Sequence, residues 1–528
     1  MKKFYQTLLS LFLVLGLIFS FLPAFAQAEE AEPEVKNVYI FHENDIHGRV
    51  VGDPAPGADG KPVKEGIIGY DRVKGIINTF KELYPESVLY LDAGDAIHGT
   101  NFATLSKGQS VIRLMNEMGL NAMTLGNHEF NYGKEDLDAA IKEADFPVVS
   151  ANIVQEADGS QVFESSTILE ANGLKIGVFG LSTPETKVKS SPPNTEGYEF
   201  LDPAEVAQEQ VDALRAAGVD AVVLLCHLGM DEESEFTSYY VLDKVEGIDL
   251  VIDGHSHTYL PEGEMHGDTL IASTGSYQEN LGLVTLTFTD GKLTDKTAEL
   301  ISFEDAMQYT PDQDIADYIA AIEEENKRYT EVEVGTLLND LDGEREHVRA
   351  GETNMGNLVV DALLWATDAD VALSNGGNVR ASIPAGKVTM GDLLTVLPFG
   401  NMVTVIEVSG QDIMDALAYG TDAYPATAGK FPHVAGMSYE LHQDGEAYKV
   451  ENILVAGEPI DPAASYKLAT NDFLAVGGDG YTMFEGKPEV MLQGLMLDLV
   501  VDYIQEVLMD EAGNFGYEFT EPRIIVAD

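Results

Sequence analysis

The stretch Ala122-Met123-Thr124-Leu125-Gly126-Asn127-His128-Glu129 decides the fold class, because a short apolar run ends directly on small and polar residues. Four other apolar runs end in the same manner. They are Val38–Phe41 before Asn44-Asp45-Ile46-His47-Gly48, Val88–Leu91 before Asp92-Ala93-Gly94-Asp95, Ala221–Cys226 before His227-Leu228-Gly229, and Leu250–Ile252 before Asp253-Gly254-His255-Ser256-His257. Unalternated runs of Val, Ile and Leu are typical of strands buried under helices.

Helix-like stretches lie between these runs, so residues 37–305 are predicted to form a layered α/β domain. Because strands of a mostly parallel sheet end at one shared edge, five segments should deliver Asp, His and Asn side chains to one cleft. The predicted helices are Tyr70–Leu83, Val111–Met118 and Pro203–Ala217, and further strands are predicted at Val148–Ala151, Ile176–Leu181 and Leu270–Ala272.

A second domain is predicted for residues 332–528, after a linker helix within residues 306–331. The segment 311–329 is acidic and amphipathic, which is typical of a solvated connector. We expect Trp365 to lie in the core of the second domain. The apolar face of the connector is predicted at Ile315, Tyr318, Ile319 and Ile322, and the second domain is predicted to contain helices Asn357–Ala366 and Gly410–Tyr419 and strands Val403–Val408 and Ser465–Ala469.

The polar residues at the strand ends suit a metal centre. Carboxylate, imidazole and carboxamide groups without a thiolate favour Zn, Mn, Fe or Co. They outnumber the ligands of one ion, and two neighbouring cations can activate water and stabilise an in-line displacement at phosphorus. Each motif alone also fits a cap, a turn or a satisfied buried histidine. Five of the eleven histidines fall in this ordered set, however, which favours the metal centre.

The composition limits the class of protein. A chain of 528 residues should hold two or more domains, and 45% hydrophobic with 23% charged residues excludes a disordered chain. The formal net charge of −58 disfavours binding to nucleic acid or to an anionic membrane surface. One cysteine excludes an intrachain disulfide.

Residues 1–28 have the pattern of a secretory signal peptide. Lys2 and Lys3 precede an apolar run that extends to Phe25, and small residues follow at Ala26 and Ala28. An uncleaved membrane anchor is the alternative, which Pro23 and the acidic residues after the run disfavour. We therefore expect a secreted protein, extracellular or periplasmic, without membrane attachment after cleavage.

The ordered motifs Asn-Asp-x-His-Gly, Gly-Asp, Gly-Asn-His-Glu, His-x-Gly and Gly-His-Ser-His resemble those of the calcineurin-like metallophosphoesterases. With the second domain, the chain resembles the 5′-nucleotidase family, which includes secreted nucleotidases and UDP-sugar hydrolases. The resemblance implies a four-layer α/β/β/α sandwich domain joined by a helix to a second α/β, substrate-binding domain. It also implies a secreted dinuclear-metal 5′-nucleotidase that hydrolyses nucleoside 5′-monophosphates, and UDP-sugars as a further substrate class.

The resemblance assigns two divalent ions (Zn, Mn, Co or Fe) and their ligands. His128 is expected beside the substrate phosphate, where it stabilises charge or assists the leaving group. The assignment gives one ion Asp45, His47, Asp95 and His257 and the other ion Asp95, Asn127, His227 and His255, with Asp95 as the bridge.

One position departs from the nucleotidase pattern. The residue three places after His128 is commonly Asp in these enzymes, whereas here it is Asn131, which can orient the imidazole but cannot stabilise an imidazolium by charge. The run Gly126-Asn127-His128-Glu129-Phe130-Asn131 resembles the branch that hydrolyses 2′,3′-cyclic nucleotides and 3′-nucleotides. That activity stays open as an alternative.

The resemblance places substrate recognition in the second domain. Arg349 and Arg380 would hold the phosphate because guanidinium matches phosphate oxygens bidentately, and Asn375 would contact the nucleoside. Phe431 and Tyr481 would stack on both faces of the base. Taken singly, such arginines also fit surface ion pairs, and such aromatic residues also fit an ordinary core.

Since the two sets of residues lie in different domains, substrate would bridge them, and domain closure with a hinge near residues 311–329 is expected. A third class of function, a non-catalytic nucleotide-binding surface protein, is disfavoured by the complete ligand set. The base preference, the metal and the oligomeric state are left open by the sequence.

Overall fold

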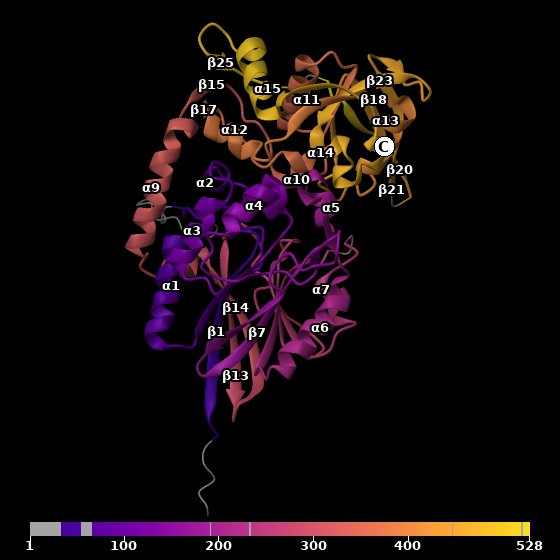
Figure 1. The fold of residues 1–528 in the computed structure, drawn as a ribbon. Helices are drawn as coiled ribbons and strands as arrows, with labels where there is room; N and C mark the ends of the chain where they lie inside the picture. The colour runs from indigo at the N-terminus through magenta and orange to yellow at the C-terminus, as the bar shows by residue number, and fades with distance from the viewer. Residues whose placement is uncertain are drawn as a thin grey trace, which may run out of the picture.

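The computed structural model describes residues 33–53, 66–190, 192–231, 234–445, 447–518 and 521–527. The predicted signal peptide, residues 1–28, lies outside the described residues. Figure 1 shows two bodies stacked end to end, with helix α9 (Gln313–Thr330) running along one side of both.

Two six-stranded sheets build the first body. The first has the order β14-β13-β1-β2-β3-β4, in which β1 to β4 run parallel and β13 is antiparallel to β1. The second has the order β11-β12-β10-β9-β7-β6. Their strands are β1 Val35–Glu43, β2 Val88–Asp92, β3 Ala122–Thr124, β4 Val148–Val149, β6 Ser166–Ala171, β7 Leu174–Ser182, β9 Ala221–His227, β10 Leu250–Asp253, β11 Glu264–His266, β12 Thr269–Ala272, β13 Asn280–Thr289 and β14 Lys292–Ser302.

Strand β9 shows why these runs are apolar on both faces. Val223 and Leu225 belong to the core between the two sheets, whereas Val222 and Leu224 belong to a core shared with helix α6 (Pro203–Ala216). Helices α1 (Tyr70–Leu83) and α3 (Gln109–Met118) contribute to the core on the outer side of the other sheet. The domain is therefore the four-layer α/β/β/α sandwich that the resemblance implies.

The predicted strands all exist, but they do not form the one mostly parallel sheet that the residue pattern suggested. β1, β2 and β3 lie in one sheet, while β9 and β10 lie in the other. The pattern could not reveal this division, because burial by a helix and burial by a second sheet both require an apolar side chain.

Helix α9 connects the two domains. It begins after Asp312, whose carboxylate accepts hydrogen bonds from the N–H groups of Asp314 and Ile315 at 3.1 and 3.2 Å. Its predicted apolar face is confirmed: Ile315 and Ile319 are buried in the core of the first domain. Its other end contacts α12 (Met390–Val396) of the second domain.

The second domain is centred on a five-stranded sheet with the order β19-β16-β23-β18-β24. Helix α11 (Asn354–Ala366) shares a core with Val403 and Val405 of β18, and α13 (Gly410–Gly420) shares another core with Ile406 and Val408. The two helices therefore cover opposite faces. The strands are β16 Val371–Asn375, β18 Met402–Ser409, β19 Pro432–Ala435, β23 Ser465–Asn471 and β24 Glu489–Leu495.

Short elements complete the chain. The expected core position of Trp365 is wrong: its side chain is 41% exposed at the end of α11, against Tyr503.

Within the described residues, no helix combines the length and apolar character needed to cross a bilayer. The remaining elements include α2 Asn101–Thr104, α4 Lys134–Ile141, α5 Thr186–Lys189, α7 Ser238–Leu242, α8 Phe303–Ala306, α10 Arg345–Val348, α14 Asp472–Ala475, α15 Met496–Tyr503, β5 Ile153–Gln155, β8 Tyr198–Phe200, β15 Glu333–Leu337, β17 Gly386–Thr389, β20 Met437–Asp444, β21 Ala447–Val455, β22 Glu458–Pro459, β25 Asn514–Phe515 and β26 Ile524–Ala527.

Candidate active site

The predicted metal ligands converge at the carboxyl ends of both sheets. Asp45, His47 and His257 place one potential ligand atom each within 4.8 Å of one another, and so do Asp45, Asp95 and His227. A third such group joins His128 to His47 and Asp95. Strand ends from two sheets thus meet at one site, even though the sheets are separate layers.

Asn127 and His255 complete this arrangement. The Nδ1 atom of His255 lies 2.9 Å from the Oδ1 atom of Asn127, and the His255 ring lies 5.3 Å from the His227 ring. On its other side, His255 Nε2 lies 3.2 Å from the Glu185 carboxylate. All seven side chains that the resemblance assigns to metal binding therefore lie close together.

The backbone at five of these seven positions is strained. Positive φ angles of 51°, 48°, 58°, 75° and 55° occur at Asp45, His47, Asp95, His255 and His257. Residues other than Gly adopt such angles rarely and at a cost of order 1–3 kcal/mol each. The surrounding structure holds these side chains in place against that cost, which is typical of a functional site.

A buried carboxylate organises two of the loops. Glu129 accepts backbone hydrogen bonds from Asp95 at 2.8 Å, Ala96 at 2.7 Å and Gly126 at 2.7 Å. A Cβ atom on Gly126 would lie 2.2 Å from the Asp95 carboxylate, so this position requires glycine. Glu129 thereby fixes the Asp95 loop to the loop that carries Asn127.

A second buried carboxylate serves the loops of the other sheet. Asp253 accepts backbone hydrogen bonds from Leu228 at 2.9 Å, Gly229 at 3.1 Å and Gly254 at 2.9 Å. It also accepts a hydrogen bond from the Ser238 hydroxyl. These contacts tie the segment after His227 to the segment before His255.

His227 has the orientation of a metal ligand. Its Nδ1 atom lies 2.8 Å from the Ala93 carbonyl, which turns Nε2 toward Asp95 Oδ2 at 3.1 Å. That Nε2 atom is buried and also lies 3.8 Å from Asp45 Oδ1. Because Nδ1 is held by a carbonyl, a divalent cation could take the place of the proton between Nε2 and these carboxylates.

The electrostatics of the cluster support the same conclusion. Burial disfavours the imidazolium of His227, but Asp95 and Asp45 outweigh burial and raise the pKa of His227 to about 10. Burial raises the pKa of Asp45 to about 7. Burial and mutual interaction shift the pKa values of these buried carboxylates and imidazoles strongly. Bound divalent cations would neutralise the carboxylates, so the cluster suits a metal site.

His128 is held by the residue that departs from the nucleotidase pattern. The Nδ2 atom of Asn131 lies 2.7 Å from His128 Nδ1, and Asn131 Oδ1 accepts a hydrogen bond from the Ser190 hydroxyl at 3.2 Å. The Asn131 amide then donates to His128, which assigns the imidazole proton to Nε2. Burial lowers the pKa of His128 to about 3, so the ring is neutral at pH 7.

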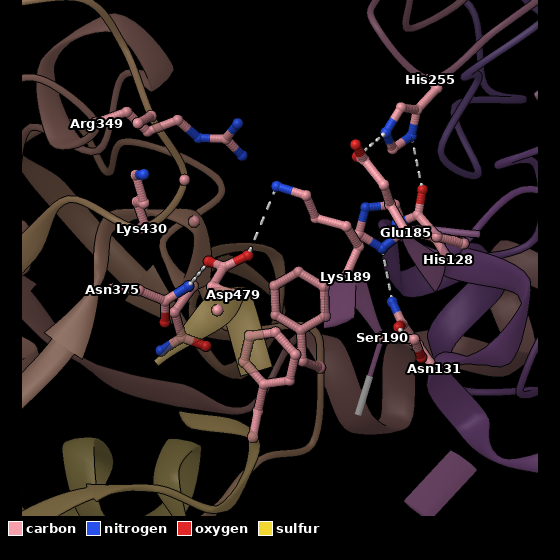
Figure 2. Close-up of a pocket in the computed structure, with 18 of the residues that line it drawn as sticks. His128, Asn131, Glu185, Lys189, Ser190, His255, Arg349, Asn375, Lys430 and Asp479 are labelled. Carbon is pink, nitrogen blue, oxygen red and sulfur yellow. Dashed lines mark hydrogen bonds and ion pairs between the residues drawn. The ribbon is translucent and has the colours of Figure 1, made fainter. Parts of the chain in front are cut away.

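The second domain supplies the opposite wall of a cavity of about 430 Å³. Figure 2 shows His128, Glu185 and Lys189 on one side and Arg349, Asn375 and Asp479 on the other. Lys189 reaches across, with Nζ 4.0 Å from the Asp479 carboxylate, and the Asn375 amide donates to Asp479 at 2.6 Å. A ligand in this cavity would touch both domains.

Arginine side chains gather at this wall although the protein is strongly acidic. Arg349 and Arg380, both predicted, line the cavity together with Arg345, which the sequence analysis missed. Burial, together with Arg345 and Arg380, lowers the pKa of Arg349 to about 9. The spacing of four residues between Arg345 and Arg349 was the available signal, since it places both on one face of a helical turn. The cluster provides an anion site.

The predicted aromatic pair requires correction. Phe431 and Tyr481 are 1% and 0% exposed and lie in a hydrophobic core of the second domain, outside the cavity lining. The Tyr481 hydroxyl donates to the Lys430 carbonyl at 2.5 Å, which anchors this ring inward. The aromatic residues that line the cavity are instead Phe399, Tyr419 and Phe473.

Fold and site together define a calcineurin-like phosphoesterase, a class of metal-dependent phosphoric ester hydrolases. The family model described as calcineurin-like phosphoesterase matches residues 38–259, and the model described as the 5′-nucleotidase C-terminal domain matches residues 332–486. The chain belongs to the 5′-nucleotidase family.

Individual relatives agree with this assignment. The chain is 30% identical to a 5′-nucleotidase of Diplobatis ommata, over 85% of this chain and 83% of that protein. It is 32% identical to the trifunctional nucleotide phosphoesterase YfkN of Bacillus subtilis over 75% of this chain, which spans 30% of that longer protein. The crystal structure of a 5′-nucleotidase precursor from Thermus thermophilus has a TM-score of 0.78 at 29% identity, covering 93% of this chain and 99% of that one.

Proposed function

We propose that this protein is a dinuclear-metal 5′-nucleotidase that converts nucleoside 5′-monophosphates to nucleoside and phosphate. The observation that carries the proposal is the cavity between the domains. One wall holds the Asp–His cluster, and the facing wall holds Arg345, Arg349 and Arg380 beside the aromatic residues Phe399 and Phe473. A phosphate and a base on one small molecule match these two kinds of surface.

Two divalent ions, Zn, Mn, Co or Fe, suit the donor set. Asp45, His47, Asp95 and His257 would hold one ion, and Asp95, Asn127, His227 and His255 would hold the other. When bound, such ions supply Lewis-acid charge at the phosphoryl group and a nucleophile at neutral pH. Asp45 and Asp95 each belong to two of the three groups of potential ligands, which supports two neighbouring ions, and the resemblance assigns the bridge to Asp95.

The side chains of the protein bind and orient the substrate. The arginines neutralise the phosphate oxygens and align the ester bond for in-line displacement. His128 offers Nε2–H to the phosphoryl group or to the leaving oxygen, and Asn131 maintains that tautomer. Phe473 offers an apolar face on which a base stacks with little preference among bases.

Phosphate release from a panel of substrates tests the proposal. The full chain, loaded with Mn or Zn, is assayed with a nucleoside 5′-monophosphate, a 3′-monophosphate, a 2′,3′-cyclic nucleotide, a UDP-sugar and 4-nitrophenyl phosphate. We expect the highest kcat/KM for the 5′-monophosphate. A metal-loaded protein that binds nucleotides but releases no phosphate from any of them would show instead a non-catalytic nucleotide-binding protein.

Asn131 favours a second candidate, a 2′,3′-cyclic-nucleotide 2′-phosphodiesterase and 3′-nucleotidase. A neutral His128 suits a leaving group that needs a hydrogen bond rather than a full proton. The same panel separates the candidates, because the second predicts that the cyclic nucleotide and the 3′-monophosphate exceed the 5′-monophosphate in kcat/KM. Hydrolysis of the UDP-sugar would extend the first candidate to nucleotide sugars.

We also propose export of the mature protein, secreted or periplasmic, from the pattern of residues 1–28. Mass spectrometry of the protein recovered outside the cytoplasm tests this proposal. Its new N-terminus is expected after Ala26 or Ala28. An intact N-terminus on membrane-bound protein would contradict it.

A further inference from the structure

His98 is a buried histidine beside the active site that the proposed reaction does not use. It follows Asp95 by three residues, in the loop after β2, and is 1% exposed. Its Nε2 atom has no hydrogen-bond partner in the part of the chain that the structure describes. Burial holds the pKa of His98 well below its usual range, so the ring is neutral. His98 belongs to none of the three groups of potential metal ligands among the described residues, so its place beside the site requires another explanation.

The His98 ring is one member of a cluster of three nearly parallel rings. It lies 5.6 Å from the His128 ring at an interplanar angle of 10°, and 5.0 Å from the Phe399 ring at 20°. The His128 and Phe399 rings are 5.8 Å apart at 26°. Offset stacking at such distances is favourable. The cluster joins the metal-binding domain, which carries both histidines, to the second domain, which carries Phe399.

Two further contacts fix the His98 ring. The backbone of Pro398 interacts with it as a hydrogen-bond acceptor, which involves the carbonyl because proline has no N–H. Tyr132 packs against it from its own domain, with ring centroids 5.0 Å apart. His98 therefore contacts both Pro398 and Phe399 of the second domain, and it also contacts Tyr132 of its own domain.

We propose that His98 is a positioning residue. It fixes where Pro398 and Phe399 of the second domain lie relative to His128 when the cavity closes. Its ring sets the distance between His128, which faces the phosphate, and Phe399, which lines the nucleotide cavity. This inference rests on the proposed function for its substrate. It adds that the His98 side chain links the approach of the two domains to the position of His128 at the phosphoryl group.

Three substitutions separate the contacts of His98. His98→Phe keeps a ring and loses the hydrogen bond, His98→Gln keeps a donor and loses the ring, and His98→Ala loses both. Because closure follows binding, we expect the loss in kcat rather than in KM, at about threefold for each of the first two variants and about tenfold for alanine. His266→Phe, at a surface histidine paired with Asp243, is the matched control and should behave as the unaltered protein.

A distance measurement provides a readout independent of turnover. Spin labels at Lys142→Cys and Gln443→Cys, both exposed and in different domains, report the interdomain distance, and the native Cys226 is buried. With adenosine and inorganic phosphate bound, the unaltered protein should show a narrow distance distribution. His98→Ala should broaden it or shift it to longer distances, with bound metal unchanged.

Two results would overturn the role of His98. One is an alanine variant with the kcat and the distance distribution of the unaltered protein. The other is a loss of activity that only follows a loss of bound metal. If the unaltered protein releases no phosphate from 5′-monophosphates, the proposed function fails, while the distance measurement still decides the role of His98.

Discussion

The Nδ2 atom of Asn131 lies 2.7 Å from Nδ1 of His128, so an uncharged amide orients the histidine that we propose faces the substrate phosphate. Asn131→Asp should raise the pKa of His128 from its value of about 3, because an adjacent carboxylate favours the imidazolium. We expect kcat for 5′-monophosphates to change by roughly tenfold and the pH–rate profile to gain a limb that falls as pH rises through the new pKa.

Steady-state kinetics between pH 5 and 9 measure this effect, with metal content determined alongside. Asn131→Ala, which removes the orienting hydrogen bond without adding charge, should lower kcat and add no such limb. Unchanged kinetics in Asn131→Asp at full metal occupancy would show that this position is not coupled to proton transfer.

Bound metal should be essential. A strong chelator should abolish hydrolysis, and Mn or Zn added back should restore it, since the arginines and His128 alone supply no nucleophile. Asp95→Asn should lower kcat by roughly 10³-fold or more and reduce the metal content from two ions per chain toward one, because Asp95 lies within reach of both ligand groups. Elemental analysis and phosphate release measure both effects, and undiminished rates in the stripped protein would refute the dinuclear site.

Glu129 should control metal affinity without touching the metals. Its carboxylate accepts backbone N–H groups from Asp95, Ala96 and Gly126, and a glutamine can satisfy only part of this set. We expect Glu129→Gln to weaken metal binding by roughly 10–100-fold, with activity largely recovered at high metal concentration. Glu156→Gln, at an exposed ion pair with Lys187, is the control. Wild-type metal affinity in Glu129→Gln would show that metal binding does not depend on these hydrogen bonds to Glu129.

The aromatic residues of the second domain allow a direct test of the corrected assignment. Phe473→Ala should raise KM for nucleotides by roughly tenfold, because base stacking contributes about 1–3 kcal/mol, and should cost less stability than Phe431→Ala because Phe473 is only partly buried. Phe431→Ala should destabilise the second domain by about 3–5 kcal/mol and leave KM unaltered, because Phe431 is buried in the core. A KM effect at Phe431 with none at Phe473 would restore the original assignment.

This contrast shows what the sequence could predict and what it could not. The candidate ligands Asp45 and His227 lie at the ends of apolar strands, so the local pattern sufficed to place each of them at a strand end. It did not reveal that the two strands belong to different sheets whose ends meet at one site. The direction of Phe431 was not predictable, because an aromatic residue after glycine turns points to a core or a cavity according to packing between distant segments. Lys189 enters the cavity from the other domain, and no local pattern carries that relationship.

His433 gives a prediction for stability that does not involve the metals. It is buried in the second domain, its Nε2 lies 2.9 Å from the Val348 carbonyl, and burial lowers its pKa to about 4. The folded state therefore prefers neutral His433, whereas the unfolded chain takes up a proton below pH 6.5. The stabilisation is fully present above pH 6.5 and is lost as pH falls toward 4, which amounts to about 2 kcal/mol between pH 7 and pH 5.

Urea denaturation of the metal-free protein at both pH values measures this change through the second domain. His433→Gln retains a hydrogen-bond donor for Val348 but does not titrate, so the difference between pH 7 and pH 5 should shrink by about 2 kcal/mol. The matched control is His442→Gln, at a partly exposed histidine next to Glu440, which should retain the pH dependence of the unaltered protein. Equal pH dependence in the His433 variant and the unaltered protein would place the titrating groups elsewhere and contradict the assignment.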